Sequence, residues 1–153
     1  MIKKIILILA TLTMLYSCGY TPILSNKTDN KFDIEIVNSI GDRELNNFIS
    51  QKIKRLSNKN DKNKKFLIEI NTNFEKKDLT KNLSGDTTQY KLIANVTINV
   101  KSENFEKVFN FKEKTSINNF DDEFKQTTYE RSVKENLSTV IINKLIMQLT
   151  KIE

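Results

Sequence analysis

The residues that could carry out chemistry are few in this sequence, and the most conspicuous is a cysteine. Cys18 is the only cysteine among 153 residues, and it directly follows an apolar N-terminal run. One cysteine cannot form an internal disulfide, and a chain without histidine lacks the partners of a typical zinc site. The absence of histidine also removes the commonest general base and every Ser-His or Cys-His pair. We therefore predict no catalytic residue, no metal site and a protein that is not an enzyme.

Cys18 ends a segment that has the three parts of a secretory signal. Two lysines give it a positive start, and positions 5–15 form an apolar run that is too short for a permanent membrane span. A leucine stands three positions before Cys18 and Ser17 stands directly before it, as in a bacterial lipobox. We predict that residues 1–17 are a cleaved signal peptide and that Cys18 carries covalent lipid. The alternative is an ordinary signal anchor with a chance cysteine.

Lipid on Cys18 would attach the mature protein to a membrane. Each buried acyl methylene contributes about 0.8 kcal/mol, and stable attachment needs about two chains. Residue 19 is Gly rather than the Asp that retains lipoproteins in the inner membrane of enteric bacteria, which favours the outer membrane. Residues 18–31 are polar and contain the only proline, so they are predicted to form a lipidated tether before a folded domain over 32–153.

The positive charge of the chain suggests where an anion could bind. The net charge is +6, which reflects either an anionic partner or a lysine-rich, AT-biased genome. Lys76, Lys77 and Lys81 lie close together in a predicted hairpin loop over 76–88, where they would attract a phosphate or carboxylate head group. A solvated loop is the alternative. Nucleic acid is not an expected partner, because the aromatic residues fall on apolar faces and the protein is exported.

The periodicity of the apolar residues predicts four strands and two helices. In chain order these are a strand from 32–37, a helix over 41–57, strands over 65–77, 89–101 and 105–115, and a helix over 120–152. Each strand has one apolar and one polar face, so the sheet cannot be a doubly covered parallel one. We predict an α+β two-layer sandwich, a four-stranded, mostly antiparallel sheet with both helices on one face, in the order β-α-β-β-β-α.

Two faces follow from these patterns. The final helix is expected to bury a stripe formed by Phe124, Tyr129, Val133, Leu137, Val140, Ile141, Leu145 and Leu149. The second face of the sheet collects amides, hydroxyls and charges from three strands: Glu69, Asn71, Asn73, Glu75, Lys91, Asn95, Thr97, Asn99, Lys101, Asn110, Lys112 and Lys114. This face is either simply solvated or in contact with a polar, wet surface such as the interior of an outer-membrane barrel.

The chain resembles the LPS-assembly lipoprotein (LptE) family, in particular its alphaproteobacterial branch. The resemblance rests on "CGYTPI", on the helix "DRELNNFISQKIKRL", on the strand "YKLIANVTINV" and on the C-terminal segment "NNFDDEFKQTTYERSVKENLSTVIINKLIMQL". It covers nearly the whole mature chain and keeps the order of elements. The sequence departs from the family at Ser132 and Val133, where small residues are frequent, and the loop 76–88 has no family signature.

The resemblance implies a function in the outer membrane. Members of this family plug the barrel of the LPS translocon (LptD), help to assemble it and bind lipopolysaccharide (LPS) on its way to the outer leaflet. It therefore implies LptD and LPS as partners, with the protein lipid-anchored on the periplasmic side and within the barrel lumen. The alternative is a free-standing periplasmic lipoprotein that binds a small ligand or another secretion or envelope complex.

Overall fold

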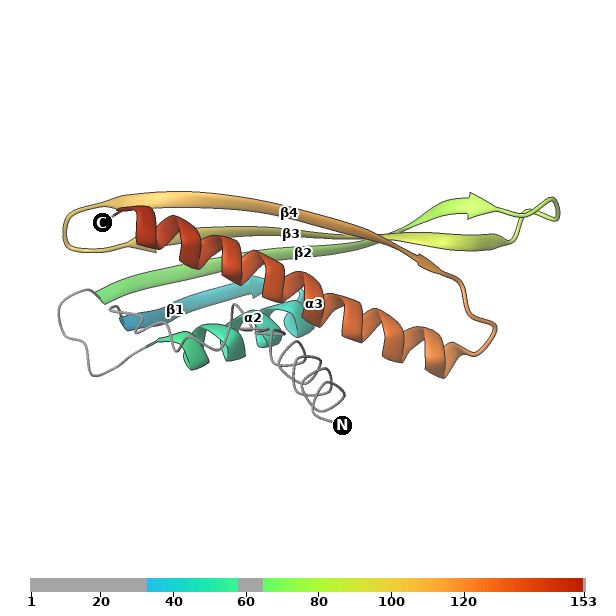
Figure 1. The fold of residues 1–153 in the computed structure, drawn as a ribbon, viewed down its shortest axis with the longest axis horizontal. Coiled ribbons are helices and arrows are strands. Elements are labelled where there is room, and N and C mark those ends of the chain that lie inside the picture. The colour runs from blue at the N-terminus through green and yellow to red at the C-terminus, as the bar shows by residue number, and fades with distance from the viewer. Residues whose placement is uncertain (1–32, 58–64, 153) are drawn as a thin grey trace, which may run out of the picture.

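The computed structural model describes residues 33–57 and 65–152, which form one sheet and two long helices. The elements are β1 (Asp33–Gly41), α2 (Arg43–Leu56), β2 (Lys65–Lys81), β3 (Thr87–Lys101), β4 (Glu106–Asn118), α3 (Glu123–Leu149) and the short 3-10 helix η2 (Thr150–Ile152). This order confirms the predicted α+β fold, as Figure 1 shows. The predicted signal peptide, Cys18 and its tether lie outside the described residues.

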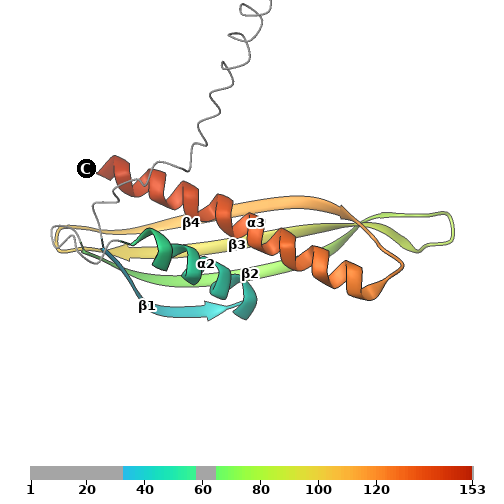
Figure 2. The same cartoon turned by 60° about the horizontal axis from the view of Figure 1, so that its bottom comes forward.

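The sheet has the strand order β1-β2-β3-β4. β1 runs parallel to β2, and the other two pairs are antiparallel, as predicted. The parallel pair follows from the connection, because α2 carries the chain back to the end of the sheet where β1 began. Both α2 and α3 lie on the same side of the sheet (Figures 1 and 2), so the fold has two layers.

The core lies between the helices and the apolar face of the sheet. Alternate residues of β2 and β3 are buried, and they meet Leu45, Ile49 and Ile53 of α2 and the central and C-terminal turns of α3. Burial of one such aliphatic side chain contributes about 1.5–3 kcal/mol before the entropy of ordering is deducted. The strand members of this core are Ile34, Phe66, Ile68, Ile70, Leu92, Ala94, Val96, Ile98, Val100, Phe109 and Ile117.

Both helices begin at an aspartate that caps the first turn. The Leu45 amide donates to Asp42 Oδ1 at 2.8 Å, and the Lys125 amide donates to Asp122 Oδ1 at 3.0 Å. Such a cap satisfies one of the amides that have no partner within the helix, and the carboxylate also favours the positive end of the helix dipole. Asp42 and Asp122 therefore fix where the two helices begin.

The junction between β1 and α2 depends on a glycine. Gly41 has φ of +101°, and a Cβ built there would lie 1.8 Å from the carbonyl oxygen of Thr72. The next residue, Asp42, donates its amide to the same carbonyl at 3.2 Å. Only glycine combines this backbone conformation with so close an approach to β2.

The buried stripe of α3 differs in part from the prediction. Val133, Leu137, Ile141, Leu145 and Leu149 are buried as expected, and Ile142 joins them. Phe124, Tyr129 and Val140 are exposed, so their assignment to the stripe was wrong. The first turns of α3 lie away from the strands in Figure 1, and Phe124 in these turns is 79% exposed. Tyr129 packs on Phe120 rather than in the core, and Val140, further along the helix, is 42% exposed.

The β2–β3 hairpin is longer than the sequence predicted. The two strands continue to Lys81 and from Thr87, so the expected loop over 76–88 shrinks to the turn 82–86. Residues 79–86, which we call the hairpin tip, have no third strand beside them among the described pairings. Figure 1 shows this tip projecting from the body.

Among the described residues, neither helix combines the length and apolarity needed to cross a membrane.

Candidate functional site

The three lysines predicted as an anion-binding cluster lie on β2 rather than in a loop. Lys76 and Lys77 are adjacent strand residues paired with Leu92 and Lys91 of β3, and successive strand residues point to opposite faces. Lys81 is the last residue of the strand. The expectation that the three side chains share one hairpin loop was therefore wrong, because regular pairing continues through this stretch with irregularities only between Asp78 and Lys81.

Lys76 points to the helix side of the sheet. Its Nζ lies 2.5 Å from Glu130 Oε1 on α3 and 3.9 Å from the centre of the Tyr90 ring. Gln126 Nε2 donates to the same Glu130 oxygen at 2.6 Å. An ammonium over an aromatic face gains about 0.5–1 kcal/mol at an exposed site. Lys76 therefore joins the hairpin to the N-terminal part of α3, and an anion would have to compete with Glu130 for it.

Lys77 belongs to the opposite, polar face of the sheet, where Glu75 is the centre of a small network. Lys77 Nζ lies 2.6 Å from Glu75 Oε2, while Asn73 and Asn95 donate to Glu75 Oε1 at 3.0 and 3.2 Å. The hydrogen bond and charge of Lys77 hold the pKa of Glu75 below its ordinary value. Glu75 thus stays ionised and is the acceptor around which this part of the face is ordered.

Lys81 lies closest to the end of the hairpin. Its Nζ is 3.3 Å from Asp78 Oδ2, and both side chains are more than half exposed. The turn beyond it is held by Asn82, whose Oδ1 accepts the amides of Ser84 and Asp86 at 3.0 and 2.9 Å. An exposed ion pair of this kind contributes about 0–1 kcal/mol, so Lys81 is the lysine of the three that an incoming anion could recruit most easily.

The polar face of the sheet has the composition that the sequence predicted. Its side chains bond across strands: Thr97 donates to Asn110 at 2.8 Å, and Asn99 donates to Glu106 at 3.0 Å. Asn99 Oδ1 is a buried oxygen without a hydrogen-bond partner among the described residues. Both helices lie on the other side of the sheet (Figures 1 and 2), and no described element covers this face.

The sequence did not predict the ion pairs that join the two helices. Lys134 on α3 reaches the α2 start, with Nζ 3.3 Å from Asp42 Oδ2 and 3.0 Å from Glu44 Oε2. It also lies 4.5 Å from the centre of the Phe74 ring, and its side chain is only 15% exposed. Periodicity gave no signal for this contact, because it depends on the relative placement of the two helices.

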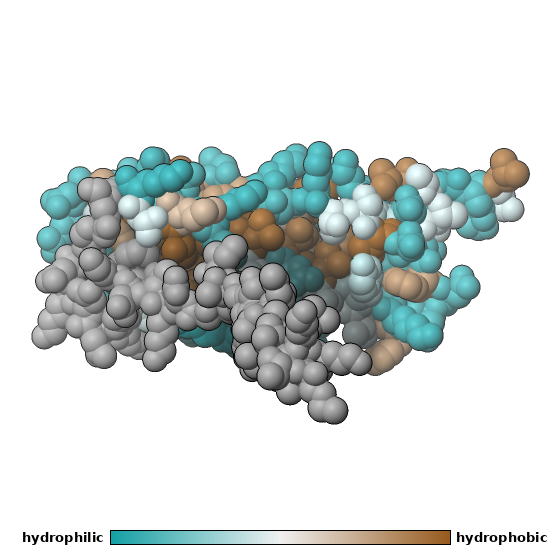
Figure 3. Space-filling view, viewed as in Figure 1, coloured by the Kyte–Doolittle hydropathy of each residue, from teal (hydrophilic) through white to brown (hydrophobic). Residues whose placement is uncertain are grey.

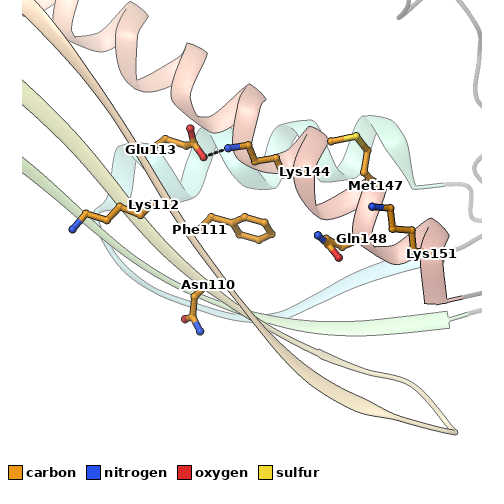
Figure 4. A pocket seen from close by; sticks show the side chains of 8 residues that line it. All are labelled: Asn110, Phe111, Lys112, Glu113, Lys144, Met147, Gln148 and Lys151. Atoms are coloured by element: carbon orange, nitrogen blue, oxygen red, sulfur yellow. Dashed lines mark hydrogen bonds and ion pairs between the residues drawn. The ribbon is translucent and has the colours of Figure 1, made fainter.

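A cleft of about 480 Å³ opens between β4 and the C-terminal turns of α3. Phe111 points from β4 towards the helix, and Met147, Gln148 and Lys151 project from the helix side (Figure 4). Lys144 forms an ion pair with Glu113 across the cleft. Among the described residues no group of three or more Cys, Asp or Glu side chains could hold a metal ion.

Apolar surface is also exposed away from the core. Figure 3 shows apolar side chains between α3 and the strands and again at the projecting end of the hairpin. At that end Leu79 is 43% exposed and Leu83 is fully exposed. Phe120 and Tyr129 stack edge-to-face, with ring centroids 5.5 Å apart, close to the start of α3. Such exposed residues are typical of contact surfaces when they gather in one region.

Solved structures share this fold. The chain is similar to rare lipoprotein B from Shewanella oneidensis, with a TM-score of 0.56 and 11% identity, covering 79% of this chain and 97% of that one. It is also similar to an uncharacterized lipoprotein B from Nitrosomonas europaea, with a TM-score of 0.52 and 14% identity, covering 78% and 84%. No protein-family model matches the sequence, and neither does any curated protein. At these identities the likeness establishes the fold.

Proposed function

We propose that this protein is an outer-membrane lipoprotein that plugs and helps to assemble the barrel of the LPS translocon (LptD), and that it binds LPS during its insertion. In this proposal it is not an enzyme, has no cofactor beyond lipid on Cys18, and sits on the periplasmic side within the barrel lumen. The observation that carries the proposal is the shared fold, because both similar structures are bacterial lipoproteins that keep the same arrangement over most of their length.

The uncovered polar face supports a role inside a barrel. A plug must present a hydrophilic surface to the wet, polar lumen of an outer-membrane barrel. The face carries Glu75, Asn95, Thr97 and Asn110 in cross-strand hydrogen bonds, so its polar groups are already ordered in the free protein. An ordered surface loses little side-chain entropy when a partner covers it.

A pull-down tests the barrel part of the proposal. The full chain is extracted from outer membranes in mild detergent and purified through a C-terminal tag. We expect a stable one-to-one complex with a large barrel protein. A preparation that contains the chain alone would overturn the plug proposal and favour the alternative of a free-standing periplasmic lipoprotein with a small ligand, for which the cleft between β4 and α3 is the available site.

The LPS part of the proposal is tested on the three β2 lysines. Replacing Lys76, Lys77 and Lys81 by Glu removes three cations and creates repulsion towards phosphate. We expect LPS binding by the full chain to fall at least tenfold, with Lys81 the largest single contributor because only an exposed Asp78 competes for it. The matched control is Lys54→Glu with Arg55→Glu and Lys125→Glu, which makes the same charge change elsewhere. Equal losses in both triple variants would assign the effect to net charge.

A further inference from the structure

The cleft between β4 and α3 lies towards the end of the molecule from which the chain leads back to Cys18. The described chain starts at Asp33, which pairs with Lys65 of β2 and whose Oδ1 accepts from Ser57 Oγ at the end of α2. The β3–β4 turn lies at the same end, since the Phe66 and Phe105 ring centroids are 5.8 Å apart. The C-terminus of α3 also lies there (Figure 1).

Two apolar side chains, Phe111 and Met147, lie in the open cleft among lining residues that are otherwise polar or charged. Phe111 is half-buried and stacks on Phe109, with ring centroids 6.4 Å apart and an interplanar angle of 11°. Met147 faces it from α3 and is 56% exposed. An exposed thioether beside an aromatic ring offers a soft, adaptable surface to an alkyl chain. The position of Met147 is not explained by packing of the core, because the buried stripe of α3 uses its neighbours Leu145 and Leu149.

The rim of the cleft is positively charged. Three lysines line it, Lys112, Lys144 and Lys151, against the single carboxylate of Glu113. Glu113 is occupied by Lys144, and within the described residues Lys151 forms no ion pair. Figure 4 shows Lys151 beside Met147, whereas Lys112 points away from the helix on the far side of β4. The combination of two apolar side chains with a lysine that pairs with no described carboxylate fits a ligand that has both an alkyl chain and an anionic head.

We propose that this cleft binds a phospholipid of the leaflet that holds the Cys18 lipid, with an acyl chain along Phe111 and Met147 and the phosphate at Lys151. The inference uses the lipid anchor of the proposed function and assigns to the fold a second, direct contact with the membrane. That contact would fix which end of the molecule faces the bilayer, which a tether alone does not do.

A weak site is sufficient for this role because the anchor supplies the ligand at high local concentration. Positions 18 and 33 are 15 residues apart, and 15 extended residues span at most about 50 Å. A second contact within such a radius becomes intramolecular, so that its effective concentration reaches the millimolar range. A shallow, partly open cleft therefore binds adequately, and a deep pocket is not required.

The test uses the full lipidated chain reconstituted in vesicles of phosphatidylethanolamine and phosphatidylglycerol that contain a phosphatidylglycerol with a photoactivatable acyl chain. After irradiation, adducts are mapped by proteolysis and mass spectrometry. We expect adducts in the peptides that contain Phe111 and Met147. Lys151→Glu should lower their yield about tenfold, since a basic side chain at an anionic membrane contributes on the order of tenfold once attraction becomes repulsion.

Two matched variants separate the cleft from general membrane contact. Lys125→Glu makes the same charge change at the other end of α3 and should leave the adduct yield unchanged. Met147→Gln should lower the yield, whereas Leu83→Gln, which removes a still more exposed apolar side chain at the hairpin tip, should not. Because the mutated side chains are exposed, thermal melting should match the unaltered protein in all four variants.

The proposal is overturned if adducts fall mainly on the hairpin tip, or if Lys151→Glu and Lys125→Glu change the yield equally. It is also overturned if added LPS labels the cleft while the phospholipid does not, because the cleft would then be an LPS site. None of these readouts requires the barrel partner. A negative crosslinking result therefore does not contradict the plug proposal, and a failed pull-down does not contradict phospholipid binding in the cleft.

Discussion

The base and the tip of the long β2–β3 hairpin are held in different ways. Near its base, alternate residues such as Ile68, Val96 and Ile98 are buried beneath α2 and α3. At the tip, residues 79–86 have neither a third strand nor a helix layer, and Leu83 is fully exposed. The base is stabilised by burial of side chains, and the tip by local hydrogen bonds around Asn82 and between Thr80 and Thr88.

This difference indicates which part of the hairpin the fold requires. An isolated two-stranded ribbon is at best marginally stable in water, so the tip persists because the base fixes its register. Its exposed apolar side chains contribute little to the stability of the free protein. Substitutions should therefore be costly at the base and mild at the tip, which paired variants can test.

The largest effect is expected in the core below α3. Leu145 is completely buried, and Leu145→Asp places an unpaired carboxylate there, which should cost several kcal/mol of the free energy of unfolding. Met147→Asp, two residues further along the same helix, is the control and should change stability by under about 0.5 kcal/mol because its side chain is exposed. Chemical denaturation measures both. Similar midpoints for the two variants would mean that α3 does not dock on the sheet as described.

The next contrast uses Gly41 and Gly85, the two glycines with positive φ within residues 33–57 and 65–152. Gly41→Ala adds a Cβ that collides with the Thr72 carbonyl, and we expect a loss of about 3 kcal/mol or more. Gly85 has φ of +91° but nothing within 4 Å of a built Cβ, so Gly85→Ala should cost only about 1–2 kcal/mol, from backbone strain. Thermal melting of the two variants compares the values. Equal losses of stability in the two variants would contradict the expected difference between the base and the tip of the hairpin.

The smallest contrast concerns two hydroxyl groups. Thr72 is buried at the base and donates through Oγ1, lying 3.1 Å from Asn46 Oδ1, so Thr72→Val should cost about 1–2 kcal/mol. Thr80 is exposed at the tip, 2.8 Å from the Thr88 hydroxyl, and Thr80→Val should cost under about 0.5 kcal/mol. Urea denaturation resolves the two losses. A greater loss at Thr80 would show that the tip has a stabilising role that burial does not explain.

Much of the fold could be predicted because local pattern determines it. Period-two alternation located the strands, and the helical periodicity of apolar residues located both helices. The loop over 76–88 was mispredicted because Lys76, Lys77 and Asp78 have no alternation of polarity, although backbone pairing continues through them. Phe124 was mispredicted because helical spacing says nothing about where the opposing layer ends. The spacing of apolar residues indicates which side chains share a face of a helix or strand. It does not indicate which element packs against that face.

The candidate site was predictable to a lesser degree for the same reason. The polar face of the sheet followed from alternation alone, and its residues do share one side. The partner of Lys76 did not follow from alternation, since Glu130 is 54 positions from Lys76 and contact between them depends on tertiary placement. The cleft between β4 and α3 likewise brings together segments about 35 positions apart, Phe111 and Met147, with no shared motif.

The proposed plug function puts the polar face of the sheet against the interior of the LPS translocon barrel. Thr97 is in the middle of that face, so a photoactivatable amino acid placed at position 97 reports directly on what covers it. The measurement is crosslinking in intact cells, followed by identification of the adduct. We expect a single adduct with a large outer-membrane barrel protein. Adducts only with small periplasmic proteins, or no protein adduct at all, would contradict it.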